Sequence, residues 1–491
     1  MDEIVLEHHF DLADRAQDEF PLLPFRVGPG VGRLHISYEV SRVLTADKAG
    51  WEVGNIVDIG LFDPRGTAFP GGRGFRGWSG TARRTFTVGL DEATPGYLPG
   101  PIPPGTWHVL LGLYQLAPEG CDVRITIRLE PASSGRTQGI APPTLPCPFD
   151  PVPLSPGPRW FRGDLHCHSH HSDATAPLSD LVAAARAQGL DFLAVTEHNT
   201  VSHLPRLRAI ARTAPPSGRA SVPAPSVPLL IPGVELSTYH GHANLWPVTD
   251  WFDFRIWRDD QMRAVREMAR KRGVLFSVNH PKDDGPPWAF GELFEPDCIE
   301  VWGAPWFISN YQALAVWDQL LRGGRRVTAV GGSDKHQAPF TGELGWYEVG
   351  TPTTWVWAEA LSIPAIVEGL RAGRAFISEG PEGPRVELTA GAGGRQVMMG
   401  DPLLVAADEP VRLTCRVWGG AGCILRLVSA RRVLKVEVSG EEFMQEWEVE
   451  IEDDLYFRPE VIDPPEEPLE EEPAALMARA LGNPVYIKRD A

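Results

Sequence analysis

Short apolar runs separated by glycine- and proline-rich turns fill the first 150 residues. Five runs are rich in the β-branched and aromatic residues that favour strands: RLHISYEV, NIVDIGLF, RRTFTVGL, TWHVLLGLYQL and CDVRITIRLE. Short strands at this spacing are typical of two packed antiparallel sheets. We therefore predict a β-sandwich over residues 1–150, with a stiff proline-rich linker at 141–158.

Between Trp160 and about residue 345, apolar runs alternate with amphipathic segments. The β-type runs are Gly163–His166, Phe192–Thr196, Leu229–Ile231, Ala243–Val248, Val274–Val278, Cys298–Trp302 and Val327–Val330. Apolar residues at helical spacing predict helices over Pro177–Gln188, Arg258–Arg272 and Tyr311–Arg322, each followed by a glycine. This alternation predicts an α/β fold with a parallel, closed, barrel-like sheet over residues 159–380. The stretch 213–228 is expected to be an exposed loop.

After residue 345 the pattern returns mostly to strands: RVELTA, VRLTCRVWG, CILRLVSA and VLKVEVSG. We predict a C-terminal β-sandwich over residues 381–491, with an acidic segment and a short helix near Ala474 to Ala480.

Charge and composition exclude several classes of protein. The net charge is −18, but residues 441–472 hold 15 acidic residues against the single basic Arg458, so the acidity is local. No apolar run is long enough to span a membrane, and the acidic N-terminus does not resemble a signal peptide. The six cysteines form no CxxC pair. We expect a cytoplasmic protein with reduced thiols, no membrane contact and no nucleic-acid partner; its oligomeric state stays open.

Histidines concentrate in the middle of the chain, where ten of the 14 lie between residues 166 and 336. Potential metal ligands follow the predicted strands: His166 and His168, then Glu197 and His198, Glu235, His280, and finally Asp334 and His336. The carboxyl ends of parallel barrel strands meet on one face, where such folds build their active sites. Residues two apart on an extended segment point the same way, so HxH and DxH each suit one metal ion.

Each of these residues alone has a simpler interpretation. Glu197 or Glu235 could be a helix cap or a surface acid, His280 a turn residue, and an isolated HxH motif is weak evidence. His170, His171 and His203 fit no repeated position, and we assign them to exposed loops or to the surroundings of the site. Cys167 and Lys335 are expected to point away from the ligand pairs that flank them. Together, however, the groups at five strand ends predict a metal centre.

Six motifs resemble the PHP (polymerase and histidinol phosphatase) domain: GDLHCHSHHSDA, LDFLAVTEHN, PGVELST, GHANLWP, SVNHP and VGGSDKH. Their spacing is similar to the CehA/McbA-type branch. The resemblance implies a distorted (β/α)7 barrel that holds two to three divalent ions (Zn, Mn or Fe). Two positions depart from the branch pattern: Glu197 stands where Asp is usual, and Ala174 where Gly is usual.

The resemblance also implies a ligand set. His166, His168, Glu235 and Asp334 would hold a first metal; Glu235, His242 and His280 a second; and Asp173, His198 and His336 a third. His242 is preferred to His240 only because of the GH motif. Glu235, Asp334 and His242 are expected to matter most for catalysis.

The leading functional hypothesis is a hydrolase in which a metal-bridging hydroxide attacks a phosphoester, with a small and anionic ester as substrate. The same centre could instead cleave a carbamate or a carboxylic ester, and nothing in the sequence selects between phosphorus and carbon. A third hypothesis is a non-catalytic module that binds carbohydrate or protein.

Overall fold

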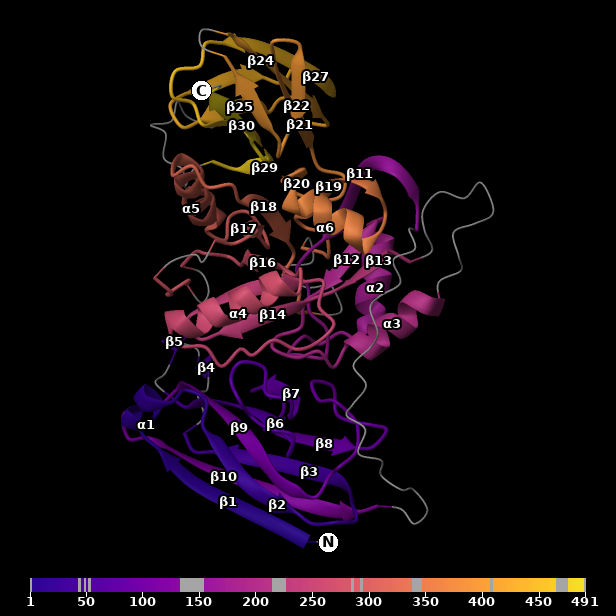
Figure 1. Ribbon diagram of the computed structural model, residues 1–491, viewed down its shortest axis with the longest axis vertical. Helices are drawn as coiled ribbons and strands as arrows, with labels where there is room; N and C mark the ends of the chain where they lie inside the picture. The colour runs from indigo at the N-terminus through magenta and orange to yellow at the C-terminus, as the bar shows by residue number, and fades with distance from the viewer. Residues whose placement is uncertain are drawn as a thin grey trace.

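The computed structural model describes residues 2–42, 46–47, 50–51, 54–132, 154–213, 227–283, 287–291, 295–337, 347–406, 409–464 and 476–489. Most of the predicted linker and loop, and part of the acidic segment, lie outside these residues. Strands of the N-terminal region form one end of the molecule, strands of the C-terminal region form the other, and the mixed region lies between them (Figure 1).

Two four-stranded antiparallel sheets form the N-terminal sandwich, with strand orders β1-β10-β3-β8 and β2-β9-β6-β7. Alternating residues such as Leu34, Ile36 and Tyr38 point inward and fill the space between the sheets. The elements are β1 (Asp2–Phe10), α1 (Leu12–Gln17), β2 (Leu22–Val27), β3 (Val31–Val40), β4 (Ala46–Asp47), β5 (Gly50–Trp51), β6 (Ile56–Phe62), β7 (Phe75–Gly80), β8 (Thr85–Gly89), β9 (Gly105–Gln115) and β10 (Cys121–Pro131).

The middle region contains five helices and ten strands. They are β11 (Pro156–Asp164), α2 (Leu178–Ala187), β12 (Phe192–Val195), α3 (Leu204–Thr213), β13 (Leu229–Pro232), β14 (Val234–Thr238), β15 (Gly241–Trp246), α4 (Asp259–Lys271), β16 (Leu275–Val278), β17 (Cys298–Gly303), α5 (Asn310–Arg322), β18 (Thr328–Gly332), β19 (Thr353–Ala360), α6 (Ile363–Arg371) and β20 (Ala375–Ser378). The three predicted helices are present as α2, α4 and α5, because each buries an apolar stripe; that of α4 includes Met262, Val265 and Ala269.

The predicted parallel sheet is wrong in two parts. β19 pairs antiparallel with both β11 and β20. β14, β15 and β16 pair antiparallel, whereas β16, β17 and β18 pair parallel, as do β11, β12 and β13. The strand predicted at 243–248 is β15, and only Tyr239 and His240 separate it from β14. So short a connection can join only antiparallel neighbours.

Two sheets therefore share the middle region, β13-β12-β11-β19-β20 and β14-β15-β16-β17-β18. Single parallel bridges join them on both sides, between His198 and Glu235 and between Cys167 and Lys335. Both bridges lie just beyond the carboxyl ends of strands, so residues that follow strands of both sheets meet there. The described residues thus form a strand-rich α/β arrangement with few helices.

The C-terminal strands are β21 (Arg385–Ala392), β22 (Arg395–Met398), β23 (Pro402–Val405), β24 (Val411–Trp418), β25 (Ile424–Ser429), β26 (Val433–Glu437), β27 (Glu442–Val449), β28 (Tyr456–Ile462), β29 (Ala478–Gly482) and β30 (Val485–Arg489). The sheet of β11 continues through β19, β20, β29, β28 and β25 to β26, and a second sheet, β22-β21-β24-β27, packs against these C-terminal strands. The helix predicted near 474–480 is wrong within the described residues, since β29 pairs with β20 and β28 there.

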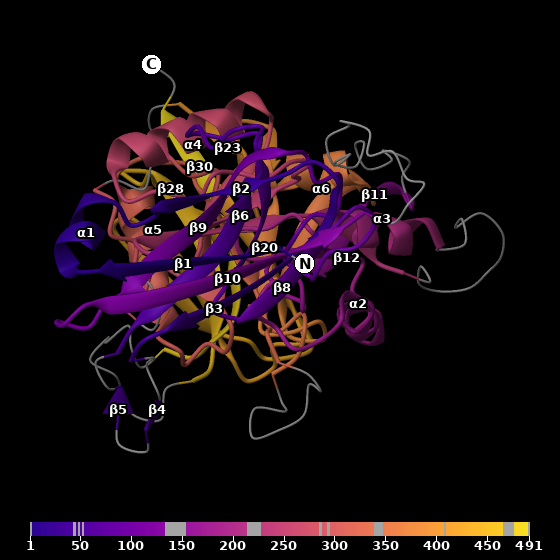
Figure 2. The same cartoon turned by 90° about the horizontal axis from the view of Figure 1, so that it is seen from below.

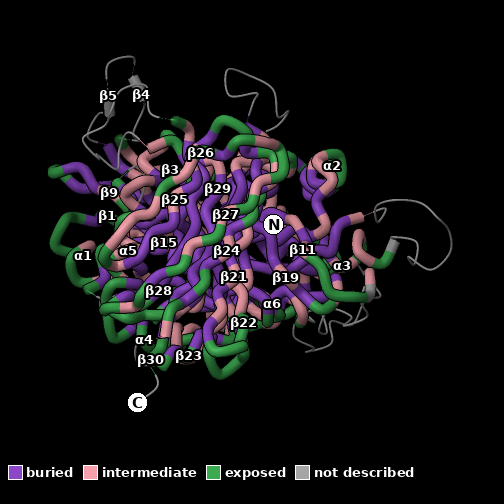
Figure 3. Tube along the Cα trace, turned by 90° about the horizontal axis from the view of Figure 1, so that it is seen from above, coloured by how far each residue is buried: buried purple, intermediate pink, exposed green. Residues whose placement is uncertain are grey.

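Apolar side chains join the N-terminal sandwich to the middle region. The indole ring of Trp251 stacks on Phe75 with ring centroids 4.1 Å apart, and Phe254 lies 4.6 Å from Trp78. Seen from below, the strands of the N-terminal sandwich lie in front of the middle region (Figure 2). Seen from above, buried segments run through the centre of the molecule (Figure 3). Among the described residues, no helix is both long and apolar enough to cross a membrane.

Candidate metal centre

The nine predicted ligands come from separate parts of the chain and gather where the two middle sheets meet. His166, His168 and Asp173 follow β11, and His198 follows β12. Glu235 lies on β14, His242 on β15, His280 follows β16, and Asp334 and His336 follow β18. Seven of the nine thus follow the end of a strand, whereas Glu235 and His242 lie within β14 and β15.

Glu235 is the centre of the cluster. Its carboxylate is buried. Glu235 is the second residue of β14, between the apolar Val234 and Leu236. Five imidazole nitrogens lie within 3.5 Å of it: His198 Nδ1 at 2.8 Å, His242 Nδ1 at 3.1 Å, His166 Nε2 and His280 Nε2 at 3.4 Å, and His168 Nε2 at 3.5 Å. Glu235 is therefore the residue best placed to serve more than one ion.

Asp334 is the second carboxylate of the first group of ligands, which also contains His166, His168 and Glu235. Its Oδ1 lies 3.3 Å from Nε2 of His166 and 3.1 Å from Nε2 of His168. The backbone of Asp334 has φ of +49°, and its N–H donates to the carbonyl of His166 at 2.7 Å. A left-handed conformation is costly outside glycine, so the turn that aims this carboxylate inward is held by its surroundings.

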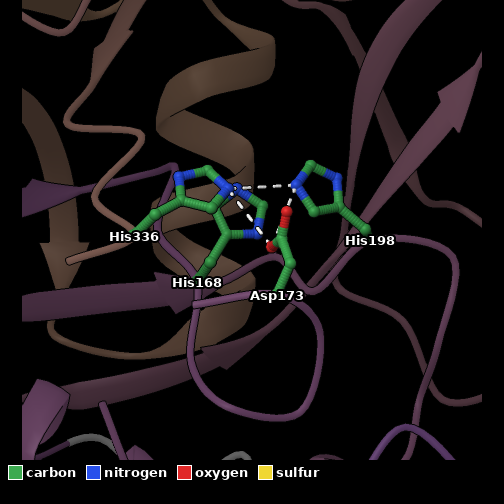
Figure 4. A group of neighbouring side chains, drawn as sticks. All are labelled: His168, Asp173, His198 and His336. Carbon is green, nitrogen blue, oxygen red and sulfur yellow. Dashed lines mark hydrogen bonds and ion pairs between the residues drawn. The ribbon is translucent and has the colours of Figure 1, made fainter. Parts of the chain in front are cut away.

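A second set of side chains surrounds Asp173 (Figure 4). Oδ1 of Asp173 lies 3.5 Å from Nε2 of His198 and 3.4 Å from Nε2 of His336, and these two nitrogens are 3.1 Å apart. The ring of His168 stacks on both imidazoles. His168 thus belongs to this group as well as to the first, which the ligand assignment from sequence did not include.

Five buried polar atoms of the first group lack a hydrogen-bond partner: Nε2 of His166, both ring nitrogens of His168, Oε2 of Glu235 and Oδ1 of Asp334. Buried polar atoms are almost always satisfied, and each one that is not costs about 1–3 kcal/mol. Two imidazole nitrogens and carboxylate oxygens directed at one point are ligands that zinc and similar divalent ions accept. The residues therefore fit a metal ion on their own chemistry.

The charges in the cluster favour a cation. Burial opposes ionisation of Glu235 and Asp334, yet the neighbouring histidines hold the pKa of both carboxyls well below the usual range. Burial likewise opposes the charged form of His198, but Asp173 and Glu235 raise its pKa to about 10. Buried carboxylates that attract protons onto histidines will equally attract a divalent ion.

Glu300 is a functional residue that the sequence interpretation missed. It lies in the middle of β17 and is buried; its Oε1 is 2.8 Å from Nδ1 of His166, and its Oε2 accepts the backbone N–H of His280 at 3.1 Å. A lone carboxylate inside the apolar run CIEVWG was the available signal. Such a partner fixes the tautomer and orientation of a ligating imidazole.

Glu197 stabilises the loop that carries Asp173. It accepts hydrogen bonds from the hydroxyls of Ser169 and Ser172, the latter at 2.6 Å, and is fully buried. Burial raises its pKa to about 7. Glu197 thus orders the loop that carries Asp173 and is neither a helix cap nor a surface acid.

Two other histidines, His240 and His203, have different surroundings. His240 Nε2 lies 3.0 Å from Glu19 in the N-terminal sandwich, so His242, and not His240, approaches Glu235. His203 is fully buried, which corrects the part of the prediction that allowed an exposed loop. Cys167 and Lys335 point away from the cluster as expected: the Cys167 thiol donates to the carbonyl of Ala194 at 3.1 Å, and Lys335 Nζ donates to that of Tyr347 at 2.6 Å.

The N-terminal sandwich forms one wall of a cavity beside the cluster. The cavity has a volume of about 660 Å³, and Asp173, His198 and His242 line one side of it. Asp58, Trp78, Gly80, Thr81 and Tyr114 of the sandwich are among the residues that line the other. The sandwich also holds a loop of the cluster, because Arg83 donates to the carbonyl of Ser172 at 2.8 Å and to that of His170.

A family model and a solved structure are similar to parts of this chain. No curated protein matches the chain. A solved structure from Bacteroides vulgatus, described as a two-domain protein containing a predicted PHP-like metal-dependent phosphoesterase, is 18% identical, with a TM-score of 0.36; the similarity covers 67% of this chain and 97% of that one. Residues 164–244, which carry His166, His168, Asp173, His198, Glu235 and His242, match the PHP domain family.

Proposed function

We propose that this protein is a metal-dependent hydrolase of the PHP type and that it acts on phosphoesters. The observation that carries the proposal is the set of buried ligand atoms on His166, His168, Glu235 and Asp334 that lie 3.1–3.5 Å from one another without forming hydrogen bonds. A role that involves no metal ion offers no reason to bury these atoms without hydrogen bonds. The match of residues 164–244 to the PHP domain supports the same conclusion.

The ligands fall into three groups. His166, His168, Glu235 and Asp334 would hold one ion, Glu235 with His242 and His280 a second, and Asp173 with His198, His336 and the nearby His168 a third. Bound divalent ions of the Zn, Mn or Fe kind would polarise the oxygens of an ester and acidify a water molecule.

The charges and hydroxyl groups around the cluster bear on which substrate binds and on which oxygen attacks it. Asp173, Glu235 and Asp334 contribute three negative charges, which do not fully offset two or three divalent ions, so the site would favour an anionic substrate. The nearby hydroxyls of Ser169 and Ser172 are engaged with Glu197, and that of Ser237 lies 2.6 Å from His198 Nδ1. Water is the proposed source of the hydrolytic oxygen.

A substrate panel tests the proposal. The purified protein, loaded separately with Mn, Zn, Fe or Mg, would be given aryl phosphate monoesters and diesters, aryl carbamates and aryl carboxylic esters. We expect turnover of phosphoesters with at least one metal. If only carbamates or carboxylic esters are turned over, the enzyme attacks a carbonyl carbon and the phosphoester part of the proposal is wrong. No turnover of any ester, in a protein shown to bind metal, would overturn the proposal.

A matched control separates true turnover from contamination. Glu235→Ala, purified in the same way, removes the carboxylate that contacts five histidines. Activity that persists in this variant comes from another enzyme or from another site.

A further inference from the structure

The N-terminal sandwich places one carboxyl group, that of Asp58, in the wall of the cavity beside the metal cluster. Asp58 lies on β6, and the same cavity is lined by Asp173, His198 and His242. The other sandwich residues described in this wall are uncharged: Ile56, Trp78, Ser79, Gly80, Thr81, Ala82, Tyr114 and Gln115. A carboxyl group that lies in a mostly uncharged wall, in the same cavity as a cation-binding wall, is placed to meet a substrate between the two walls.

Tyr239 fixes the orientation of this carboxyl. Its phenol donates to Oδ2 of Asp58 at 2.7 Å, and its ring stacks on Phe20 with centroids 5.1 Å apart. Tyr239 lies on the turn between β14 and β15, the two strands that carry Glu235 and His242. The hydrogen bond therefore connects the sandwich wall to the hairpin that supplies metal ligands, and it engages Oδ2 of Asp58, not Oδ1.

The two walls differ in what they can do to an ester. The metal-ligand wall suits the charged acyl or phosphoryl group, so the rest of the ester must extend toward the sandwich. Trp78, Ala82 and Tyr114 offer contact to an apolar leaving group there. Its departing oxygen develops negative charge as the ester bond breaks, and a proton donor beside it lowers the barrier.

We infer that Asp58 is a catalytic residue of the hydrolysis proposed above, the general acid that protonates the leaving group, and that Tyr239 positions it. This inference rests on the proposed function. As water oxygen bonds to phosphorus, the bond from phosphorus to the leaving oxygen breaks, and that oxygen takes the Asp58 proton. The proton lost by water then returns Asp58 to its acid form, which balances the reaction without a further reactant.

The ionisation of Asp58 is consistent with this role. Burial raises its pKa to about 6, against the lowering effects of the Tyr239 hydrogen bond, Arg84 and His198, while Asp173 acts in the same direction as burial. A carboxyl group whose pKa is raised toward neutrality remains partly protonated under those conditions and can donate its proton within the catalytic cycle.

A leaving-group series tests the inference on the metal-loaded, full-length protein. Asp58→Asn keeps an oxygen that can accept the Tyr239 hydrogen bond but has no acidic proton. Its loss of kcat/KM should be below about fivefold on 4-nitrophenyl phosphate, whose leaving group needs no proton, and about a hundredfold on phenyl phosphate. A loss of equal size on both substrates would overturn the general-acid role while leaving the hydrolase function intact.

A pH profile gives a second, independent measurement. Tyr239→Phe removes a hydrogen bond that favours the ionised carboxylate, so the pKa of Asp58 should rise. The alkaline limb of kcat/KM, which reports loss of the acid's proton, should then move to higher pH, whereas a purely structural role of Tyr239 would lower the rate without moving the limb. Asp122→Asn, at an exposed side chain of β10, is the matched control and should leave both readouts unchanged. Wild-type protein inactive on every ester would overturn both proposals.

Discussion

Nδ1 of His166 lies 2.8 Å from Oε1 of Glu300, so this imidazole is held between a carboxylate behind it and Glu235 and Asp334 in front of its Nε2. The other oxygen of Glu300 accepts the backbone N–H of His280. One buried carboxylate thus orients one predicted ligand through its ring and another through its backbone, although neither is its neighbour in sequence.

Replacing Glu300 with Gln should weaken metal binding without unfolding the protein. The amide keeps an acceptor for His166 but removes the negative charge that favours an Nδ1–H tautomer with a free Nε2. We expect metal affinity and turnover to fall about 10- to 100-fold. Metal titration and steady-state kinetics would measure both. The control is Glu368→Gln on exposed α6, and equal affinities for the two variants would contradict the role of Glu300.

Glu235→Ala should have the largest effect of any ligand substitution. The variant loses the carboxylate shared by the first two groups, so these sites should empty, whereas the group around Asp173 keeps its own members. Turnover should fall by at least about a thousandfold, because no side-chain nucleophile replaces the activated water. Elemental analysis of the folded variant gives the metal content. Full occupancy with near-normal turnover would refute the ligand assignment.

Arg83→Gln should act at a distance through the loop that carries Asp173. The guanidinium group holds the carbonyls of His170 and Ser172 from the sandwich side, and an amide cannot reach both. We expect about tenfold weaker binding of one ion, the one near Asp173, and unchanged binding of the others. Competition with a chelator would resolve the classes of site. Arg128→Gln, which breaks an exposed pair with Glu3, should change none of them.

His203 should make the protein sensitive to acid. Burial lowers its pKa to about 3, from an ordinary value of 6.5, so the folded state keeps this imidazole neutral. As the pH falls below 6.5, the unfolded chain binds a proton that the folded chain excludes. The free energy of unfolding therefore drops by up to about 1.4 kcal/mol per pH unit from this residue, and it is recovered as the pH rises.

Denaturant titrations between pH 7 and pH 4.5 would measure that slope. His203→Leu removes the imidazole that takes up this proton, so the free energy of unfolding of the variant should fall less steeply with decreasing pH than that of the wild type. His8→Leu, on the exposed strand β1, should keep the wild-type slope. Identical slopes for all three proteins would show that His203 does not control acid stability.

Several elements could be predicted from local pattern because local pattern causes them. The stripe of Met262, Val265 and Ala269 makes α4 a helix in any setting that covers this face, and strands such as β3 follow from simple alternation. HxH and DxH at strand ends likewise predicted that His166, His168, Asp334 and His336 would meet, since strand ends converge.

Other features depended on partners that are distant in sequence. An alanine-rich segment became β29 because β20 and β28 flank it, and pairing with both outweighs helix propensity. The antiparallel direction of β15 follows from the short turn at Tyr239 and His240, which lies between two apolar runs that pattern alone assigned to a parallel sheet.

By itself, the sequence determined which residue types stand at the ends of which strands, and hence that a metal centre was to be expected. Only the tertiary structure decided that Glu300 supports His166, that His242 and not His240 approaches Glu235, and that Asp58 shares a cavity with the predicted ligands. The physical reason is that ligand motifs are local, whereas orientation and cavity walls arise from contacts between segments far apart in the chain.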